Sequence, residues 1–303
     1  MDIAKQTGLA RWLAEPHSAG SLVDLAAGWR DHDIILTLAP VAPAGTEFGA
    51  HLRRSFLGGL APGASVPARI GQPCPWDPPC ALDVFLREQL RAGGDGLPKP
   101  YVLFWHQQAR VMEVTLRIFG IACDWAPAAA EGITAGLTSI LPWSMALRGQ
   151  PAPPAILHRF AEVTPLADDI PEGPLTLTFL SPMDDEGANP KGRGDAAARL
   201  LSRALRRVDA LARWQGLRLS DTALRDLTAR VHALRADSLR LQRATCDSPN
   251  RHSQVRRTQV VSGSLDLPPL DADLRLLLSL IRRCHLGRHT NEGLGRIEIK
   301  PRR

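Results

Sequence analysis

HLGRHTNEGLGRIEI, the segment from His285 to Ile299, decides how the C-terminal half of the chain is interpreted. Its glycines allow turns with positive φ and a close approach of the backbone to a ligand. The residues between the glycines carry donors suited to phosphate and ribose oxygens, namely Arg288, His289, Thr290 and Asn291. These residues alone leave two interpretations open, a flexible turn between a helix and a strand, and a loop that holds RNA.

Apolar periodicity upstream of this segment predicts a split β-α-β unit with one inserted helix. The expected elements are strand 175–180, amphipathic helix 195–214, helix 220–243, a β-hairpin over 254–267 turning at Ser262-Gly263, helix 271–284 and strand 296–299. On the second helix, the wheel places Arg225, His232 and Arg243 within about 20° of one another. Arg235 and Arg240 flank this stripe.

The N-terminal half repeats the same β-α-β-β-α-β order. Its expected elements are strand 33–41, helix 48–60, strands 101–105 and 109–121, helix 128–141 and strand 156–163. A Pro/Gly-rich insertion over 62–98 carries a short helix near 82–91. The sequence therefore predicts an α+β protein of two tandem ferredoxin-like domains, 1–165 and 175–303. The second domain would carry a basic helical insertion over 195–243 and the glycine-rich loop over 285–296.

Positive charge is concentrated in one part of the chain. The 303 residues carry a net charge of +6, but the window from Arg193 to Arg243 alone holds twelve arginines, five aspartates and no lysine. The remaining residues therefore sum to about −1. Because a guanidinium grips phosphate bidentately and stacks on bases, this window indicates a polyanionic partner.

The remaining composition points to a cytoplasmic protein. No stretch of 18 apolar residues exists, and the first 14 residues lack a secretory pattern. Five scattered cysteines suit a reducing compartment better than a disulfide framework. Cys74 and Cys80 resemble a metal knuckle but lack a second pair, so no metal site or cofactor is expected.

The glycine-rich segment resembles the C-terminal loop of the CRISPR-associated repeat-processing endoribonucleases of the RAMP superfamily. Their loop has the form His-Φ-Gly-[Lys/Arg]-x-Thr-x-x-Gly-Leu-Gly-[Lys/Arg]-x-x-Φ, where Φ is apolar. The matching residues are His285, Gly287, Arg288, Thr290, Gly293, Leu294, Gly295 and Arg296. The segments 175–182, 200–216 and 253–264 extend the resemblance. The segment 220–243 is similar to the arginine-rich helical finger of the type IV version.

The resemblance implies metal-independent cleavage of CRISPR repeat transcripts to mature guide RNA. The ribose 2′-hydroxyl attacks the adjacent phosphate and leaves a 2′,3′-cyclic phosphate and a 5′-hydroxyl. His51 is the candidate acid or base, although a packing histidine is an equal interpretation, and Arg53 and Arg54 are the candidate cations. The candidate RNA contacts are Arg199, Arg203, Arg206, Arg225, Arg235, Arg240, Arg243, Arg256, Arg257, His285, Gly287, Arg288, His289, Gly293 and Gly295.

The implied partners are the repeat hairpin or guide RNA and other CRISPR effector subunits, with no membrane. Two alternatives stay open. One is a non-catalytic subunit of the same fold that holds guide RNA. The other is a DNA-binding regulator that uses the arginine-rich helices, against which no compact helix-turn-helix is evident.

Overall fold

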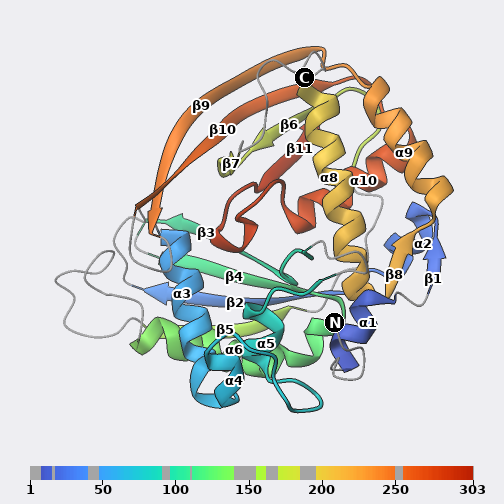
Figure 1. Cartoon of the computed structure of the whole chain (residues 1–303). Helices are drawn as coiled ribbons and strands as arrows, with labels where there is room; N and C mark the ends of the chain where they lie inside the picture. Colours follow the sequence, from blue (N-terminus) through green and yellow to red (C-terminus); the bar gives the residue numbers. More distant parts are fainter. Residues whose placement is uncertain are drawn as a thin grey trace.

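The computed structural model describes residues 8–15, 18–39, 48–90, 96–109, 111–139, 155–161, 170–184, 196–249 and 255–302. Two mixed layers of helix and sheet lie one above the other, the N-terminal half below and the C-terminal half above (Figure 1). Among the described residues, no helix has both the length and the apolar character needed to cross a bilayer.

An antiparallel sheet in the order β3-β4-β2-β5 organises the first half. Its strands are β2 (Asp31–Ala39), β3 (Tyr101–Gln108), β4 (Val111–Phe119) and β5 (Ala155–Ala161). The helices are α3 (Phe48–Leu60), α4 (Val66–Arg69), α5 (Ala81–Leu86) and α6 (Ala126–Ser139). The order β2-α3-β3-β4-α6-β5 is the one that the sequence predicts.

Glycines in α6 are explained by its packing against α3. A Cβ on Gly136 would lie 2.0 Å from the carbonyl oxygen of Ser55, and a Cβ on Gly59 would lie 1.8 Å from that of Gly132. Glycine lowers helix propensity by about 1 kcal/mol relative to alanine. Here it permits backbone contact between the two helices, so the helical periodicity prevails over the low propensity.

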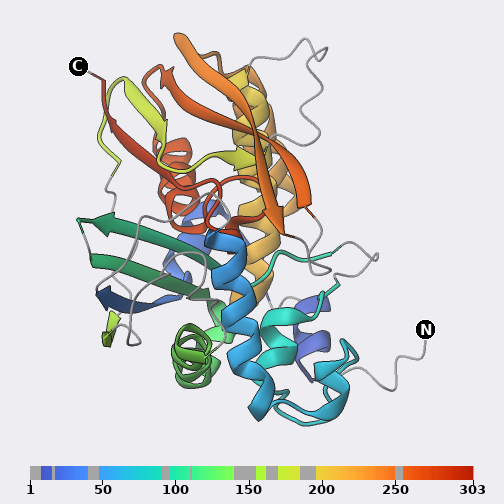
Figure 2. The same cartoon turned by 90° about the vertical axis from the view of Figure 1, so that its left-hand side faces the viewer.

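A second antiparallel sheet has the central strand β10. Strand β9 pairs with one edge of β10, and β6 and β7 pair with the other edge; β11 pairs with the far edge of β6. Its strands are β6 (Leu175–Phe179), β7 (Met183–Asp184), β9 (Ser238–Pro249), β10 (Val255–Leu267) and β11 (Ile297–Pro301). The helices are α8 (Ala196–Ala212), α9 (Asp221–Ala233) and α10 (Ala272–Cys284). The β9–β10 ribbon extends beyond the sheet and arches toward α3 (Figures 1 and 2).

The expected helix over 220–243 is wrong in its second part. Helix α9 ends at Ala233, and Leu234 is already extended at φ −64° and ψ 141°. From residue 238 the leucines alternate with polar residues at the period of a strand, and this segment pairs with β10 over twelve positions. Arg235, Arg240 and Arg243 therefore do not share a helix face with Arg225.

The expected hairpin turn at Ser262-Gly263 is also wrong. Strand β10 runs straight through this pair, and its hairpin partner is β9. Gly263 has φ +118°, and a Cβ there would lie 2.0 Å from the carbonyl oxygen of Arg240. The glycine thus serves a close strand-to-strand contact. The connection between the strands, 250–254, falls outside the described residues.

The N-terminal segment lies against the second half, which the sequence did not predict. It comprises α1 (Gly8–Ala14), β1 (Ser18–Gly20) and α2 (Leu22–Ala27). Strand β1 pairs in parallel with β8 (Leu217–Leu219), and α2 packs on α10. The side chain of Gln215 bonds both backbone groups of Arg30 at 2.9 Å, so the two halves are joined on this side as well.

Candidate functional site

The glycine-rich loop is a folded structure with its own backbone hydrogen bonds. It leaves α10 through His285 at φ +59° and enters β11 through Gly295 at φ +74°. The N–H of Leu286 donates to the carbonyl oxygen of Gly295, and the N–H of Gly295 donates to that of Pro182, each at 2.8 Å. A short 3-10 turn, η5 (Thr290–Glu292), lies in its middle.

Two of the loop glycines serve packing within the protein. A Cβ on Gly295 would lie 1.8 Å from the carbonyl oxygen of Leu286, and a Cβ on Gly293 would lie 2.3 Å from the Trp105 ring. Both glycines are buried. Their role is therefore to let the loop close on itself and on β3, whereas Arg288 is exposed and Gly287 and His289 are half-buried.

His285 lies in the protein interior, with 1% of its surface exposed. Its ring centroid lies 5.3 Å from that of Phe104. Burial, together with the positive charges of Arg117 and Arg207, holds the pKa of His285 well below its usual range. The imidazole is therefore neutral at physiological pH, and its place in the core makes it a support of the loop.

Arg207 of α8 anchors the loop from the second half. Its Nε donates to the carbonyl oxygen of Cys284 at 2.8 Å, and its Nη2 donates to Thr290 Oγ1 at 2.6 Å. The sequence of α8 does not indicate that Arg207 differs from the other arginines of this helix. Only the fold shows that Arg207 fixes the loop while Arg206, the preceding residue, is exposed.

The first half presents α3 and β3 to the loop. A Cβ on Gly49 would lie 1.8 Å from the carbonyl oxygen of Glu292, and Arg53 Nη1 lies 3.6 Å from Glu292 Oε1. On the other flank, the Arg296 guanidinium stacks 4.7 Å from the centroid of the Phe104 ring. The loop therefore sits at the junction of the two halves and contacts both.

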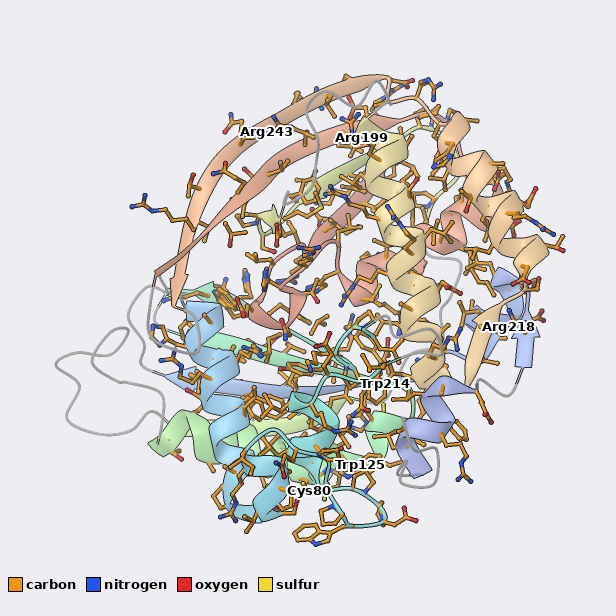
Figure 3. All side chains as sticks on the ribbon, in the orientation of Figure 1. Cys80, Trp125, Arg199, Trp214, Arg218 and Arg243 are labelled. Atoms are coloured by element: carbon orange, nitrogen blue, oxygen red, sulfur yellow. The ribbon has the colours of Figure 1, made fainter. Side chains whose placement is uncertain are left out.

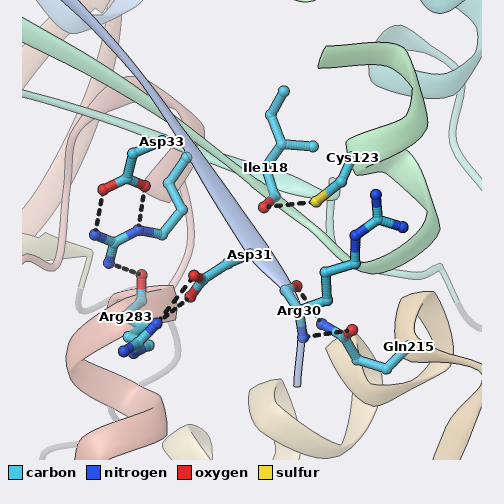
Figure 4. A network of polar contacts seen from close by, with 8 residues as sticks. Arg30, Asp31, Asp33, Ile118, Cys123, Gln215 and Arg283 are labelled. Atoms are coloured by element: carbon cyan, nitrogen blue, oxygen red, sulfur yellow. Dashed lines mark hydrogen bonds and ion pairs between the residues drawn. The ribbon is translucent and has the colours of Figure 1, made fainter. Parts of the chain in front are cut away.

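Buried ion pairs hold the halves together beside the loop (Figure 4). Arg283 at the end of α10 donates to both carboxylate oxygens of Asp31 at 2.9 Å. Arg117 of β4 forms a bidentate pair with Asp33 at 2.6 and 2.7 Å and also donates to the carbonyl oxygen of Arg283. This network fixes how the loop is placed relative to α3.

The structure does not bring the three catalytic candidates together. Gly49 and Arg53, one helical turn apart on α3, face the loop. At 100° per residue, His51 lies about 160° around the helix from Arg53. His51 is half-buried and Arg54 is exposed. Of the three, Arg53 is the side chain that the fold places beside the glycine-rich loop.

The arginine candidates separate into three regions. Arg199, Arg203 and Arg206 lie on α8, and Arg225 lies exposed on α9, which packs against α8. Arg243 projects from the β9–β10 ribbon, and Arg199 lies at the upper end of α8 (Figure 3).

On the ribbon, the register places Arg243 and Arg257 on one face and Arg240 on the other. Arg240 pairs with Asp266 at 3.2 Å. Arg235 is exposed just beyond α9. The side chain of Arg256 lies outside the described residues.

A cavity of about 570 Å³ opens where α8, the glycine-rich loop and the segment before β3 meet. Its lining residues come from both halves and are Glu88, Gly96, Leu97, Pro98, Lys99, Arg206, Arg207, Ala210, Gly287, Arg288, His289, Thr290 and Asn291. Four of these residues are candidates from the sequence, namely Arg206, Gly287, Arg288 and His289. The sequence missed Lys99 and Arg207, because nothing in their local sequence sets them apart.

The cysteine knuckle is a packing feature. Cys74 and Cys80 are buried, and the Cys74 Sγ accepts a hydrogen bond from the N–H of Cys80 at 3.4 Å. In the part of the chain that the structure describes, no group of three or more His, Cys, Asp or Glu side chains is arranged to hold a metal ion.

Fold and site together define a protein of two β-α-β-β-α-β halves with a glycine-rich loop seated at their junction. Solved structures that share this architecture include Cas6 proteins. The product complex of Cas6 (TTHB231) superposes with a TM-score of 0.55 at 14% identity, covering 89% of this chain and 99% of that one. Thermus thermophilus Cas6 (TTHB231) superposes with a TM-score of 0.51 at 13% identity, covering 90% of this chain and 99% of that one. The product complex of Cas6 (TTHA0078) superposes with a TM-score of 0.50 at 19% identity, covering 89% of this chain and 99% of that one.

No protein-family model matches the sequence, and no match was found among curated proteins. The likeness is therefore one of fold, and the chain has a Cas6-like fold. At the level of fold, this confirms the resemblance that the glycine-rich segment indicates.

Proposed function

We propose that this protein is an endoribonuclease that cleaves CRISPR repeat transcripts to mature guide RNA. The reaction needs no metal ion and leaves a 2′,3′-cyclic phosphate and a 5′-hydroxyl. One observation carries the proposal: the glycine-rich loop is locked between α3, β3 and α8 and borders a cavity rich in cationic side chains. The product complexes of proteins with this fold support it.

We also propose that each half is a ferredoxin-like domain, within 1–165 and 175–303. The strand order with the first strand between the third and fourth supports this in both sheets. The β1–β8 pairing then makes the N-terminal segment a brace between the domains.

The cleavage step needs in-line alignment of the 2′-oxygen, cations for the developing negative charge, and an acid and a base. Arg53 lies beside the loop and is proposed to stabilise the phosphorane, with Arg54 at the rim. His51 is proposed as the acid or base. Because His51 and Arg53 lie on opposite sides of α3, a cleavage site built on His51 and one built on Arg53 are alternatives.

The protein is further proposed to keep the processed guide within an effector complex, where other subunits bind it. The exposed Arg206 and the half-buried Arg199 and Arg203 of α8, with the exposed arginines of the β9–β10 ribbon, supply a surface for that RNA.

A non-catalytic guide-binding subunit is the second candidate, favoured by the opposite placement of His51 and Arg53 on α3. Incubation of the full chain with a labelled repeat hairpin in EDTA separates the two. Cleavage with a cyclic phosphate end supports the enzyme, and tight binding without products supports the subunit.

A further inference from the structure

Lysine is rare in this chain, and one lysine occupies an unusual position. The sequence holds 33 arginines but only four lysines, Lys5, Lys99, Lys191 and Lys300. Lys300 is exposed on β11, whereas Lys99 is half-buried in the cavity wall directly before β3. Lys5 and Lys191 fall outside the described residues. An ammonium is a compact point charge whose pKa responds to its surroundings, which an arginine does not offer.

The first half surrounds Lys99 with a mixed set of charges. Its Nζ donates to the carbonyl oxygen of Leu86. Burial, and then the positive charge of Arg53, lowers the pKa of Lys99 to about 8, while Glu88 acts in the opposite direction. The neighbouring Arg87 and Asp83 compensate each other through a bidentate pair. The protonated amine therefore lies where one further negative charge would stabilise it.

The second half faces the same cavity with basic side chains. Arg206 and Arg207 come from α8, and Arg288 and His289 come from the loop. The Arg207 guanidinium donates hydrogen bonds to Cys284 and Thr290. It therefore adds positive charge to the cavity wall while it stays bonded to the loop. His289 lies 3.3 Å from Asp184. Among the lining residues that the structure describes, Glu88 is the one carboxylate, against Lys99, Arg206, Arg207 and Arg288, so these side chains carry an excess of positive charge.

We propose that this cavity binds a phosphate group of the RNA, gripped by Lys99 from the first half and by Arg206 and Arg288 from the second. The inference rests on the proposed function and names a contact within it. A volume of about 570 Å³ lies within the range of roughly 300–1,000 Å³ typical of small-ligand sites, which suits a phosphate with its ribose. The ammonium donates hydrogen bonds to the non-bridging oxygens, and the bound anion offsets the positive charges that surround it.

The test uses the full chain labelled with 13C-lysine, whose few Cε signals are assigned by single Lys→Arg substitutions. Inorganic phosphate is the first probe, because its binding does not depend on cleavage. We expect phosphate to shift the Lys99 signal and to raise the pKa of Lys99 by about one unit, with no change at Lys300. A Lys99 pKa that stays unchanged at saturating phosphate, or equal shifts at both lysines, would overturn the site whether or not the protein cleaves RNA.

The repeat hairpin is the second probe. K99M is expected to weaken RNA binding about 10-fold and to reduce the salt dependence by about one phosphate contact. K300M, the matched surface control, leaves both unchanged. Wild-type affinity falls as the pH rises through the titration of Lys99, whereas K99R keeps its affinity. If K99M binds like K300M, phosphate contact by Lys99 is ruled out even in an active nuclease. If phosphate binds at Lys99 and no hairpin is cut, the site stands and the proposed enzyme function fails.

Discussion

Gly49 of α3 and Glu292 of the glycine-rich loop are in direct backbone contact across the junction of the two halves. The hydrogen atoms of Gly49 face the Glu292 carbonyl, where a Cβ would come within 1.8 Å of the oxygen. Arg53, one turn further along α3, reaches the Glu292 carboxylate at 3.6 Å. The glycine-rich loop is therefore positioned by a helix more than 220 residues earlier in the chain.

The first prediction concerns that contact. Because a methyl group at residue 49 cannot fit without moving α3 or the loop, G49A should lower the free energy of unfolding by about 1–3 kcal/mol. Urea denaturation measures the change. G63A is the matched control, since nothing lies within 4 Å of a Cβ there, and it should stay within about 0.5 kcal/mol of wild type. Equal stability of the two variants would contradict the contact.

The second prediction concerns the Asp31–Arg283 pair between the halves. Asp31 is 3% exposed, so D31A leaves a guanidinium in the interior without this carboxylate and should cost about 3–5 kcal/mol. The exposed Arg30–Asp124 pair provides the control, and D124A should change the free energy of unfolding by less than about 1 kcal/mol. A loss in D31A no larger than in D124A would show that the network does not join the halves.

The third prediction is a pH dependence of stability from His285. Its pKa is depressed in the folded state by burial, so its contribution to stability is complete above the unfolded pKa of about 6.5 and is lost as the pH falls below that value. Between pH 6.5 and 5.0 the loss should reach about 2 kcal/mol. Denaturation of H285Q at both pH values should show a decrease smaller by that amount. If the free energy of unfolding decreases equally in wild type and H285Q, the histidine is exposed to solvent and its pKa is not depressed.

The fourth prediction separates the catalytic candidates. Because Arg53 faces the loop, R53A should slow single-turnover cleavage of the repeat hairpin by about 100-fold while changing the hairpin Kd by less than about threefold. R218A on β8, where the arginine pairs with Asp221, is the control and should cleave like wild type. H51A measures the proposed acid–base role. A wild-type rate in H51A would remove His51 from the mechanism, and a wild-type rate in R53A would remove Arg53.

The strand and helix order was predictable from the sequence because local periodicity was strong. Helix 48–60 matches α3 at both ends. The strands of the first half were predicted in their order along the chain, because their apolar residues alternate with polar ones. The segment 234–243 was wrongly predicted as helix because the spacing of its leucines and arginines fits a helix face as well as a strand. Its state is decided by pairing with β10, a contact that no local pattern contains.

The candidate site was predictable only in part. The loop and Arg206 were identified from motif and charge, and the structure places Arg206, Arg288 and His289 at one cavity. Lys99 and Arg207 were missed because their role depends on distant partners, Arg53 and Thr290 among them. The prediction that His285 contacts RNA stays untested, and its burial gives that residue a supporting place in the core.

The most direct test of the proposed function is the chemistry of the RNA ends. The purified full chain is incubated in EDTA with a labelled repeat transcript from an array beside its gene. The account predicts one cut, with a 2′,3′-cyclic phosphate on the upstream fragment and a 5′-hydroxyl on the downstream fragment. Tight binding of the transcript with no cleavage under the same conditions would contradict it and leave a guide-binding subunit.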